Sequence, residues 1–263
     1  MDLQLQGKKA FIAGSSRGLG LAAARALAQE GCSVAINGRR ETPLRDSADR
    51  LRAETGAEVH PLQGDVSQEG RPARLISEAI SVLGGLDLLV TNSGGPPVSA
   101  FEDISDDLWQ EAVDLTFLSH VRLIQAALPH LRKSDHASVL TVTSYSVKQP
   151  IPNLVLSNSI RSATVGLTKT LALELGGDGI RFNSILPGWT KTERVIEIMS
   201  ARAEDNQTTV EEEIARQASV SPLGRMADPQ EFGQAAAFLL SPAASYLTGV
   251  MLTVAGGTYK GTL

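Results

Sequence analysis

Three glycines in the stretch AGSSRGLG, Ala13 to Gly20, have a spacing that points to chemistry. Gly14 permits a tight turn, while Gly18 and Gly20 allow a backbone and a helix amino terminus to come close to a pyrophosphate. The spacing is G-x-x-x-G-x-G, and a glycine pattern alone also fits a bare turn. The stretch follows a β-rich run and opens an alanine-rich segment that ends near Gly31, which favours a dinucleotide site.

Such a site requires parallel strands that end at one edge of a sheet. Short β-rich runs alternate with segments that carry helix signals, and this alternation predicts a parallel sheet covered on both faces. The helix signals include Thr42 before Pro43 as cap and first-turn residue, and Ser105 before Asp106 and Asp107. The predicted strands are Lys9 to Ala13, Ser33 to Asn37, Glu58 to Leu62, Leu86 to Thr91, Ser138 to Thr143, Ile180 to Leu186 and Val250 to Val254.

The expected fold is a doubly wound, Rossmann-type α/β fold with a seven-stranded parallel sheet, formed by residues 1–263 as a single domain. No repeat, low-complexity tract or long linker divides the chain. Thr192 to Ser219 is rich in charge and lacks a strand signal, so it is expected to form a pair of solvated helices. Its position between two strands also suits a lid over a substrate cleft.

Composition argues against several classes of function. The net charge is -5 and no cluster of Lys or Arg is longer than a pair, so nucleic acid is not an expected partner. No apolar run approaches the ~20 residues of a membrane span, so a cytoplasmic protein with no membrane partner is expected. The single cysteine, Cys32, is expected to be a buried apolar residue. No metal is expected, because the histidines lack ligand spacing and surface positions explain all of them: His60, His120, His130 and His136.

Four further motifs follow the glycine turn. They are GDV at Gly64 to Val66, TNSG at Thr91 to Gly94, GIRFNSILPGWTKT at Gly179 to Thr192 and SPLGRMADPQEFGQAAAFLLSPAASYLTG at Ser221 to Gly249. In this order they resemble the short-chain dehydrogenase/reductase family, and within it the 3-oxoacyl-acyl-carrier-protein reductases. The resemblance runs nearly end to end and implies a nicotinamide cofactor. The cofactor contacts that it implies are Gly14, Ser16, Arg17, Gly18, Leu19, Gly20, Gly38, Arg39, Asp65, Val66, Asn92, Gly94, Arg161, Pro187, Gly188, Thr190 and Thr192.

The end of the second predicted strand distinguishes the two nicotinamide cofactors. A carboxylate there would bind the ribose 2′-hydroxyl and select NAD. Gly38 stands at that point instead, followed by Arg39 and Arg40, and Arg17 lies in the glycine turn. Guanidinium groups suit a 2′-phosphate, so Arg17 and Arg39 favour NADP(H) over NAD(H), whereas Arg40 is expected to be a solvated surface residue.

The catalytic Ser, Tyr, Lys and helix Asn of the family are altered in this chain. By the resemblance they align with Ser144, Ser157, Arg161 and Asp114, in that order. Positions 157 and 161 stay on one helix face, so Arg161 is expected to keep a ribose contact. A serine hydroxyl ends roughly 4 Å short of a phenol and is a poor general acid; Ser157 and Asn158 also fit a helix cap.

Two other residues are candidates for the proton donor. Tyr145 lies beside Ser144 on a loop at the carboxyl end of a strand, and Lys148 follows on the same loop to assist it. Packing in the pocket wall is the alternative for Tyr145. Asp114 is the weaker candidate, because an ionised carboxylate pairs readily with Arg161 or Lys148.

These residues predict an NADP(H)-dependent oxidoreductase that acts on a small carbonyl or alcohol, with acyl-thioesters among the candidates, in a cleft under residues 192–219. The rival hypothesis is a nucleotide-binding protein without hydride transfer, either a sensor or an inactive subunit. Ser157 and Arg161 favour the rival, whereas Ser144 and the motif around Pro187 and Thr192 favour the enzyme.

The resemblance also implies a symmetric homodimer or homotetramer. The helices Leu108 to Leu131 and Ser159 to Leu175 and the segment after Val250 would form its interfaces. The apolar stretches VRLIQAALPHL and AAFLL exceed what one side of a small core needs, which also favours assembly.

Overall fold

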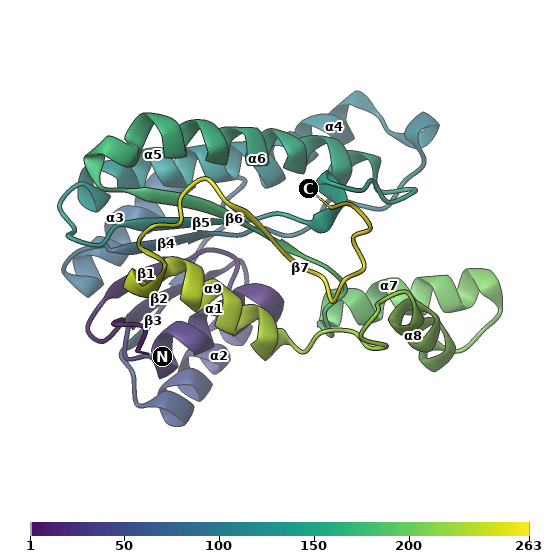
Figure 1. Cartoon of the computed structure of the whole chain (residues 1–263), viewed down its shortest axis with the longest axis horizontal. Helices are drawn as coiled ribbons and strands as arrows, with labels where there is room; N and C mark the ends of the chain where they lie inside the picture. The colour runs from purple at the N-terminus through teal and green to yellow at the C-terminus, as the bar shows by residue number, and fades with distance from the viewer. Residues whose placement is uncertain (1, 263) are drawn as a thin grey trace.

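A seven-stranded parallel sheet forms the centre of the molecule in a computed structural model that describes residues 2–262 (Figure 1). The strands are β1 (Lys9–Ile12), β2 (Ser33–Gly38), β3 (Val59–Gln63), β4 (Leu88–Thr91), β5 (Ser138–Val142), β6 (Arg181–Pro187) and β7 (Met251–Val254). Their order is β3-β2-β1-β4-β5-β6-β7, so the winding reverses between β1 and β4, where doubly wound folds open a ligand crevice. The predicted fold class is confirmed, and every predicted strand exists with its ends shifted by two residues at most.

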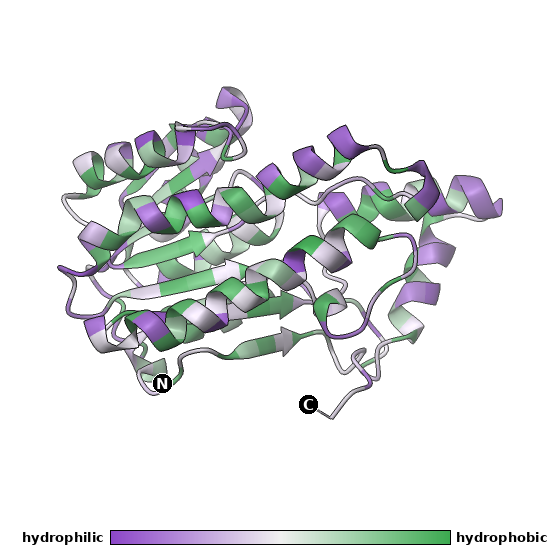
Figure 2. Ribbon diagram, turned by 90° about the horizontal axis from the view of Figure 1, so that it is seen from above, coloured by the Kyte–Doolittle hydropathy of each residue, from purple (hydrophilic) through white to green (hydrophobic). Residues whose placement is uncertain are grey.

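Helices cover both faces of the sheet. The first face carries α1 (Gly18–Gln29), α2 (Glu41–Thr55) and α9 (Pro229–Leu240). The second carries α3 (Arg71–Leu83), α5 (Ser119–Leu131) and α6 (Val155–Leu175), with α4 (Asp106–Val113) packed against α6. Figure 2 shows apolar residues along the strands and polar residues on the outer helix faces. Within residues 2–262, no helix is long and apolar enough to cross a membrane.

The predicted helix starts have different outcomes. The Oγ of Ser105 accepts a hydrogen bond from the backbone N–H of Leu108 at 3.3 Å, which confirms Ser105 as the cap of α4. The prediction for Thr42 is wrong, because α2 begins at Glu41 and Arg40 occupies the N-cap position without a side-chain cap. Pro43 is the third residue of α2 and still lies in the first turn, as predicted; it is accommodated there because the first turn of a helix leaves its N–H groups unpaired.

The apolar stretches that suggested assembly are largely used inside one protomer. In VRLIQAALPHL, the residues Leu123, Ile124, Ala127 and Leu131 are buried against the sheet, and α9 buries most of AAFLL. Cys32 is buried as expected, and burial raises the pKa of its thiol to about 12. The expected homodimer or homotetramer therefore stays a prediction that rests on the family resemblance.

The segment 192–219 forms the predicted helix pair, α7 (Glu193–Asn206) and α8 (Val210–Ser219). The pair projects beyond the main body of the protein (Figure 1). The buried carboxylate of Glu213 accepts hydrogen bonds from Thr208 at 2.8 Å, Asn206 at 3.2 Å and Arg216 at 2.7 Å. Because these contacts join the connecting loop to α8, the two helices form one unit.

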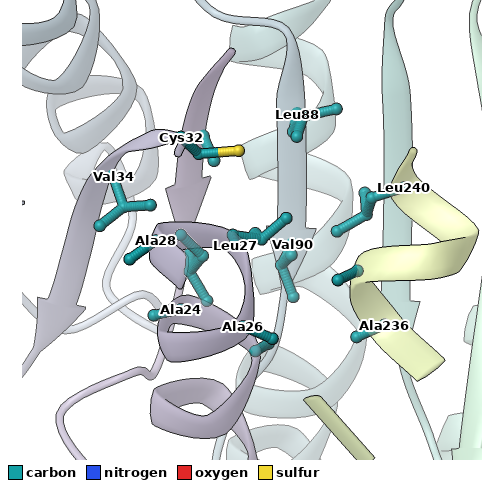
Figure 3. Packing of buried hydrophobic residues seen from close by; sticks show 14 of the residues in the cluster. Ala24, Ala26, Leu27, Ala28, Cys32, Val34, Leu88, Val90, Ala236 and Leu240 are labelled. Carbon is teal, nitrogen blue, oxygen red and sulfur yellow. The ribbon is translucent and has the colours of Figure 1, made fainter. Parts of the chain in front are cut away.

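Close packing of α1 on α9 fixes the helix whose amino terminus follows the glycine turn. Figure 3 shows the alanines of α1 between Ala236 and Leu240 of α9 and Val34 of the sheet; Leu88 and Val90 of the sheet belong to the same buried cluster. At the tightest point, a Cβ added to Gly233 of α9 would lie 2.4 Å from the carbonyl oxygen of Ala22 in α1. Only glycine at position 233 allows the two helices this separation.

We therefore expect Gly233→Ala to lower the free energy of unfolding by about 1–3 kcal/mol, because the added methyl group must push α1 and α9 apart. Urea unfolding followed by circular dichroism measures this change. Gly176→Ala is the matched control: Gly176 has a right-handed helical conformation, and a Cβ there would meet nothing within 4 Å. Equal stability of the Gly233→Ala and Gly176→Ala variants would contradict the packing argument.

Candidate active site

A cavity of about 520 Å³ opens at the carboxyl ends of β1, β2, β4, β5 and β6. The glycine turn before α1 forms one wall, and the first turns of α7 form another. Parallel strands bring residues that are far apart in the sequence to this edge of the sheet. Helix α7 of the pair thus borders the cavity, which is the position expected of a lid.

The glycine turn adopts the tight backbone that its sequence predicts. Gly14 and Gly18 have φ angles of +56° and +58°, which favour glycine. A Cβ added to Gly20 would lie 2.3 Å from the carbonyl oxygen of Gly14, so α1 starts as close to the turn as a backbone allows. Asn92 fastens the turn to the end of β4, because its Nδ2 donates to the carbonyl oxygen of Gly14 at 2.9 Å. The first turn of a helix leaves N–H groups without intrahelical partners, and such groups suit a phosphate.

Asn37 fixes the same turn from β2, and sequence reasoning missed it. Its Oδ1 accepts from the backbone N–H of Gly14 at 3.2 Å, and its Nδ2 donates to Leu62 at 3.0 Å and Gly64 at 3.1 Å. The side chain is 1% exposed. The available signal was the position of Asn37, a polar residue near the end of an apolar strand. A buried amide needs several hydrogen-bond partners, so this position indicates contacts with neighbouring loops.

Basic residues line the end of the cavity beside β2. Arg39 follows Gly38 there, and a Cβ added to Gly38 would come within 2.8 Å of the Ser16 side chain, so the backbones of the two loops lie close together. Arg17 of the glycine turn lies 3.4 Å from Glu197 of α7, and about half of each side chain is exposed. Arg17 and Arg39 are both exposed and place two guanidinium groups at this end of the cavity.

The loop after β5 brings Ser144 and Tyr145 into the cavity. The Oγ of Ser144 accepts from the backbone N–H of Ser146 at 3.1 Å, which starts a short 3₁₀ turn, η3 (Tyr145–Val147). Tyr145 is 6% exposed, and its hydroxyl oxygen accepts a hydrogen bond from the indole Nε1 of Trp189 at 3.3 Å. Trp189 was not predicted as a site residue, although it stands inside the motif GIRFNSILPGWTKT.

Ser157 and Arg161 also line the cavity, from α6. The Nε of Arg161 donates to the Oγ of Ser157 at 3.2 Å, as the spacing of four residues allows. The other guanidinium nitrogens donate to the carbonyl oxygens of Val142, Thr143 and Gly94 at 3.2, 3.4 and 3.4 Å. Burial lowers the pKa of Arg161 to about 10.

The helix-cap alternative for Ser157 and Asn158 is wrong. The helix α6 begins earlier, at Val155, with Leu154 as its N-cap residue. Asn158 instead donates from its Nδ2 to the carbonyl oxygen of Ile151 at 2.9 Å and so holds the preceding loop.

The structure does not bring Lys148 or Asp114 into the cavity lining. Lys148 is exposed, and its ammonium lies 5.3 Å from the ring centre of Tyr259. Asp114 pairs with Arg122 at 3.0 Å, and not with Arg161 or Lys148 as its sequence position suggested. The physical reason is a turn of π-helix, η2 (Asp114–Leu118), whose wider winding changes the direction of its side chains, so that Leu115 lines the cavity.

His120 is buried, so the prediction of a surface position is wrong for this histidine. It lies on α5 after the π-helical turn, is 1% exposed, and its Nδ1 lies 2.7 Å from the Oγ1 of Thr91 at the end of β4. Within residues 2–262 its Nε2 has no hydrogen-bond partner. Burial and, to a smaller extent, the charge of Arg161 lower the pKa of His120 to about 3, so its ring is neutral.

Most of the residues expected to contact the cofactor line this one cavity. The exceptions are Gly20, which serves the close approach of α1 to the turn, and Thr190, which is buried and pairs with Ala227. The expected contacts that do line it are Gly14, Ser16, Arg17, Gly18, Leu19, Gly38, Arg39, Asp65, Val66, Asn92, Gly94, Arg161, Pro187, Gly188 and Thr192.

Comparison with known proteins identifies the family. The family model described as enoyl-(acyl carrier protein) reductase matches residues 13–259. Dehydrogenase/reductase SDR family member 4 of Oryctolagus cuniculus is 34% identical over 257 residues, which cover 96% of this chain and 94% of the relative. L-sorbose reductase of Gluconobacter frateurii, solved with NADPH and L-sorbose, has a TM-score of 0.95 and 30% identity over 99% of this chain and 100% of that chain. YwfH, an NADPH-dependent reductase involved in bacilysin biosynthesis, has a TM-score of 0.92 and 25% identity over 97% of this chain and 100% of that chain.

The chain therefore belongs to the short-chain dehydrogenase/reductase family of oxidoreductases. This confirms the family resemblance that the motifs indicated. The two solved relatives named above are an NADPH complex and an NADPH-dependent reductase.

The neutral His120 makes stability depend on pH. A histidine in the unfolded chain titrates near 6.5, whereas the folded protein holds this pKa at about 3. Between these values the unfolded state binds the extra proton, so stability falls as pH falls, and we expect this group to remove about 2 kcal/mol between pH 7 and pH 5. His120→Gln should abolish that part of the loss, as measured by urea unfolding at the two pH values.

The matched control for this prediction is His130→Gln, on the same helix and partly exposed. It should keep the pH dependence of the parent protein. If His120→Gln lost as much stability at pH 5 as the parent, the buried neutral histidine would be the wrong explanation.

Proposed function

We propose that the protein is an NADP(H)-dependent oxidoreductase that interconverts a carbonyl and an alcohol. The observation that carries the proposal is that one cavity is lined by the glycine turn, by Arg17 and Arg39, and by Ser144 and Tyr145. A phosphate cradle, a basic pocket and a hydroxyl pair are the parts that hydride transfer from a bound dinucleotide requires.

The residues at the cavity fit a dinucleotide phosphate. The approach of Gly20 to Gly14 leaves no room for a Cβ, and the first turn of α1 offers free N–H groups at that point. Arg17 and Arg39 would hold the 2′-phosphate, and Asp65 and Val66 would lie at the adenine. The four contacts of Arg161 occupy at most four of its five N–H groups, which leaves a donor on Nη2 for the ribose.

The dihydronicotinamide, when bound, supplies the hydride to the carbonyl carbon. We propose that Ser144 orients the carbonyl oxygen by a hydrogen bond and that Tyr145 donates its phenolic proton to this oxygen. Ser157 is a poor donor in this proposal, because an aliphatic hydroxyl is far less acidic than a phenol and its side chain is shorter than that of a tyrosine.

The proposed substrate class follows from the apolar residues that line the same cavity as Ser144 and Tyr145. They come from the two loops that a bridge between Ser99 and Leu154 joins, from the π-helical turn η2 and from α7. We propose a carbonyl compound with an apolar substituent, and a 3-oxoacyl thioester is one candidate. The apolar residues are Val98, Leu115, Ile151, Leu154, Val195 and Ile198.

A second candidate function is binding of NADP(H) without hydride transfer, as in a sensor or an inactive subunit. The observation that favours it is the bonding of Arg161, whose guanidinium is held by Val142, Thr143 and Gly94 as a structural brace. Turnover separates the two candidates: a protein that binds NADPH but reduces no carbonyl in a broad panel would be the binding protein.

We expect NADPH to bind more tightly than NADH, because Arg17 and Arg39 would contact the 2′-phosphate. Arg39→Ala should reduce this preference by about 1.5–3 kcal/mol, through loss of charge-assisted hydrogen bonds. Fluorescence titration with both cofactors measures it. Arg40→Ala is the matched control, since Arg40 is exposed and does not line the cavity. Equal affinity of the unmodified protein for both cofactors would refute the assignment.

If Tyr145 is the proton donor, Tyr145→Phe should lower kcat by about 10²- to 10⁴-fold while the affinity for NADPH changes little. The physical reason is that phenylalanine keeps the ring but has no proton to give. Steady-state kinetics with a carbonyl compound that the parent protein reduces measures kcat. The control is Tyr246→Phe, the same change at a fully exposed tyrosine, which should leave kcat unaltered. An active Tyr145→Phe variant would exclude this donor.

A further inference from the structure

The side chain of Trp189 connects Tyr145 to the helix pair α7–α8. Its Nε1 donates to the hydroxyl oxygen of Tyr145 at 3.3 Å. The backbone carbonyl oxygen of Trp189 accepts a hydrogen bond from the backbone N–H of Ala227 at 3.0 Å, which anchors the backbone of this residue. Trp189 also lines a second cavity, of about 230 Å³, so its ring lies at the wall between the two spaces.

The hydrogen bond between these two side chains has a fixed direction. An indole N–H is a donor only, so the oxygen of Tyr145 must be the acceptor. The hydroxyl proton of Tyr145 is therefore not used in this contact. Because Tyr145 lines the cavity and is only 6% exposed, its hydroxyl proton remains available to an acceptor bound there.

We propose that Trp189 is a positioning residue that orients the phenol of Tyr145 and stabilises the phenolate formed during reduction; this rests on the proposed function. As the hydride with its electron pair reaches the carbonyl carbon, the proton leaves Tyr145 for the carbonyl oxygen and an alcohol forms. The negative charge stays on the oxygen of Tyr145 until a solvent proton replaces the one lost. The indole N–H then donates to an anion, and such bonds are stronger than neutral ones.

Arg202 of α7 holds the ring of Trp189 in place. Its guanidinium carbon lies 5.0 Å from the centre of the ring, and its Nη1 donates to the Oε1 of Gln217 in α8 at 3.0 Å. The ring is therefore fixed on one side by the helix pair and on the other by its bond to Tyr145. A change in the position of α7 would reach the phenol through this single ring.

The kinetic test compares Trp189→Phe with the parent protein. Because the lost bond strengthens only as charge develops, kcat should fall by about 10- to 100-fold while the carbonyl KM and the NADPH Kd change by less than about 3-fold. In a Tyr145→Phe background the same change should have no further effect on kcat, since Trp189 acts through the phenol oxygen. Trp109→Phe is the matched control: it is a partly buried tryptophan that packs in a different apolar cluster, and its replacement should leave kcat unchanged.

The second readout is independent of activity. The chain has two tryptophans, so a proton–nitrogen spectrum of the full-length protein contains two indole N–H signals, and Trp109→Phe assigns them. Tyr145→Phe should move the Trp189 signal upfield in the proton dimension, as expected for a lost hydrogen bond, whereas Tyr246→Phe should leave it in place.

The outcomes separate this inference from the proposed function. If the parent protein reduces no carbonyl compound, both the proposed function and the role of Trp189 are refuted. If the parent is active and Tyr145→Phe is impaired, but Trp189→Phe retains the parent kcat, only the role of Trp189 is overturned. An unmoved Trp189 signal in Tyr145→Phe, or an equal loss of kcat from Trp189→Phe in both backgrounds, overturns it as well.

Discussion

The buried guanidinium of Arg161 is the constraint on which the geometry of the site depends. Removing a charge from water costs on the order of several kcal/mol unless hydrogen bonds replace the hydration. Here the carbonyl oxygens of Gly94, Val142 and Thr143 and the hydroxyl of Ser157 replace it. The ends of β4 and β5 and the first turns of α6 must keep their relative positions, because a shift of any one would remove part of the hydrogen bonding that replaces the hydration.

The same charge sets the electrostatics of the cavity. The sequence suggested that the carboxylate of Asp114 would pair with Arg161 or Lys148. It pairs with Arg122, so it does not neutralise the charge of Arg161. Burial keeps His120 neutral, and the charge of Arg161 contributes to this. Within residues 2–262 no carboxylate forms an ion pair with Arg161, and such a buried positive charge favours an anion beside it; a phenolate at Tyr145 would be such an anion. The choice of Arg at this position is therefore compatible with proton donation from a neighbouring loop.

Local patterns predicted the elements of the fold, and long-range contacts explain what they missed. Strand runs and the glycine turn are readable because alternation and φ preferences act within a few residues. His120 has an ordinary helical position, and only the packing of α5 against β4 places it at Thr91. Asn37 has a readable signal, a polar residue near the end of an apolar strand, but its partners Gly14 and Gly64 come from other loops. Asp114 was expected at the site from the resemblance of its motif to the family, but it lies in a π-helical turn and pairs with Arg122.

A proton donor on a loop must be held as firmly as one on a helix, because general acid catalysis requires the donor within about 3 Å of the reacting atom. In the proposed role, Tyr145 would be held by three constraints of different origin. The Oγ of Ser144 shapes its backbone turn, burial restricts its ring, and the N–H of Trp189 fixes the direction of its hydroxyl. Ser157 is fixed as well, but by a donor from Arg161 and at the end of a short side chain. In the proposed mechanism the two positions divide the tasks: α6 would supply the charge, and the loop after β5 would supply the group that loses a proton.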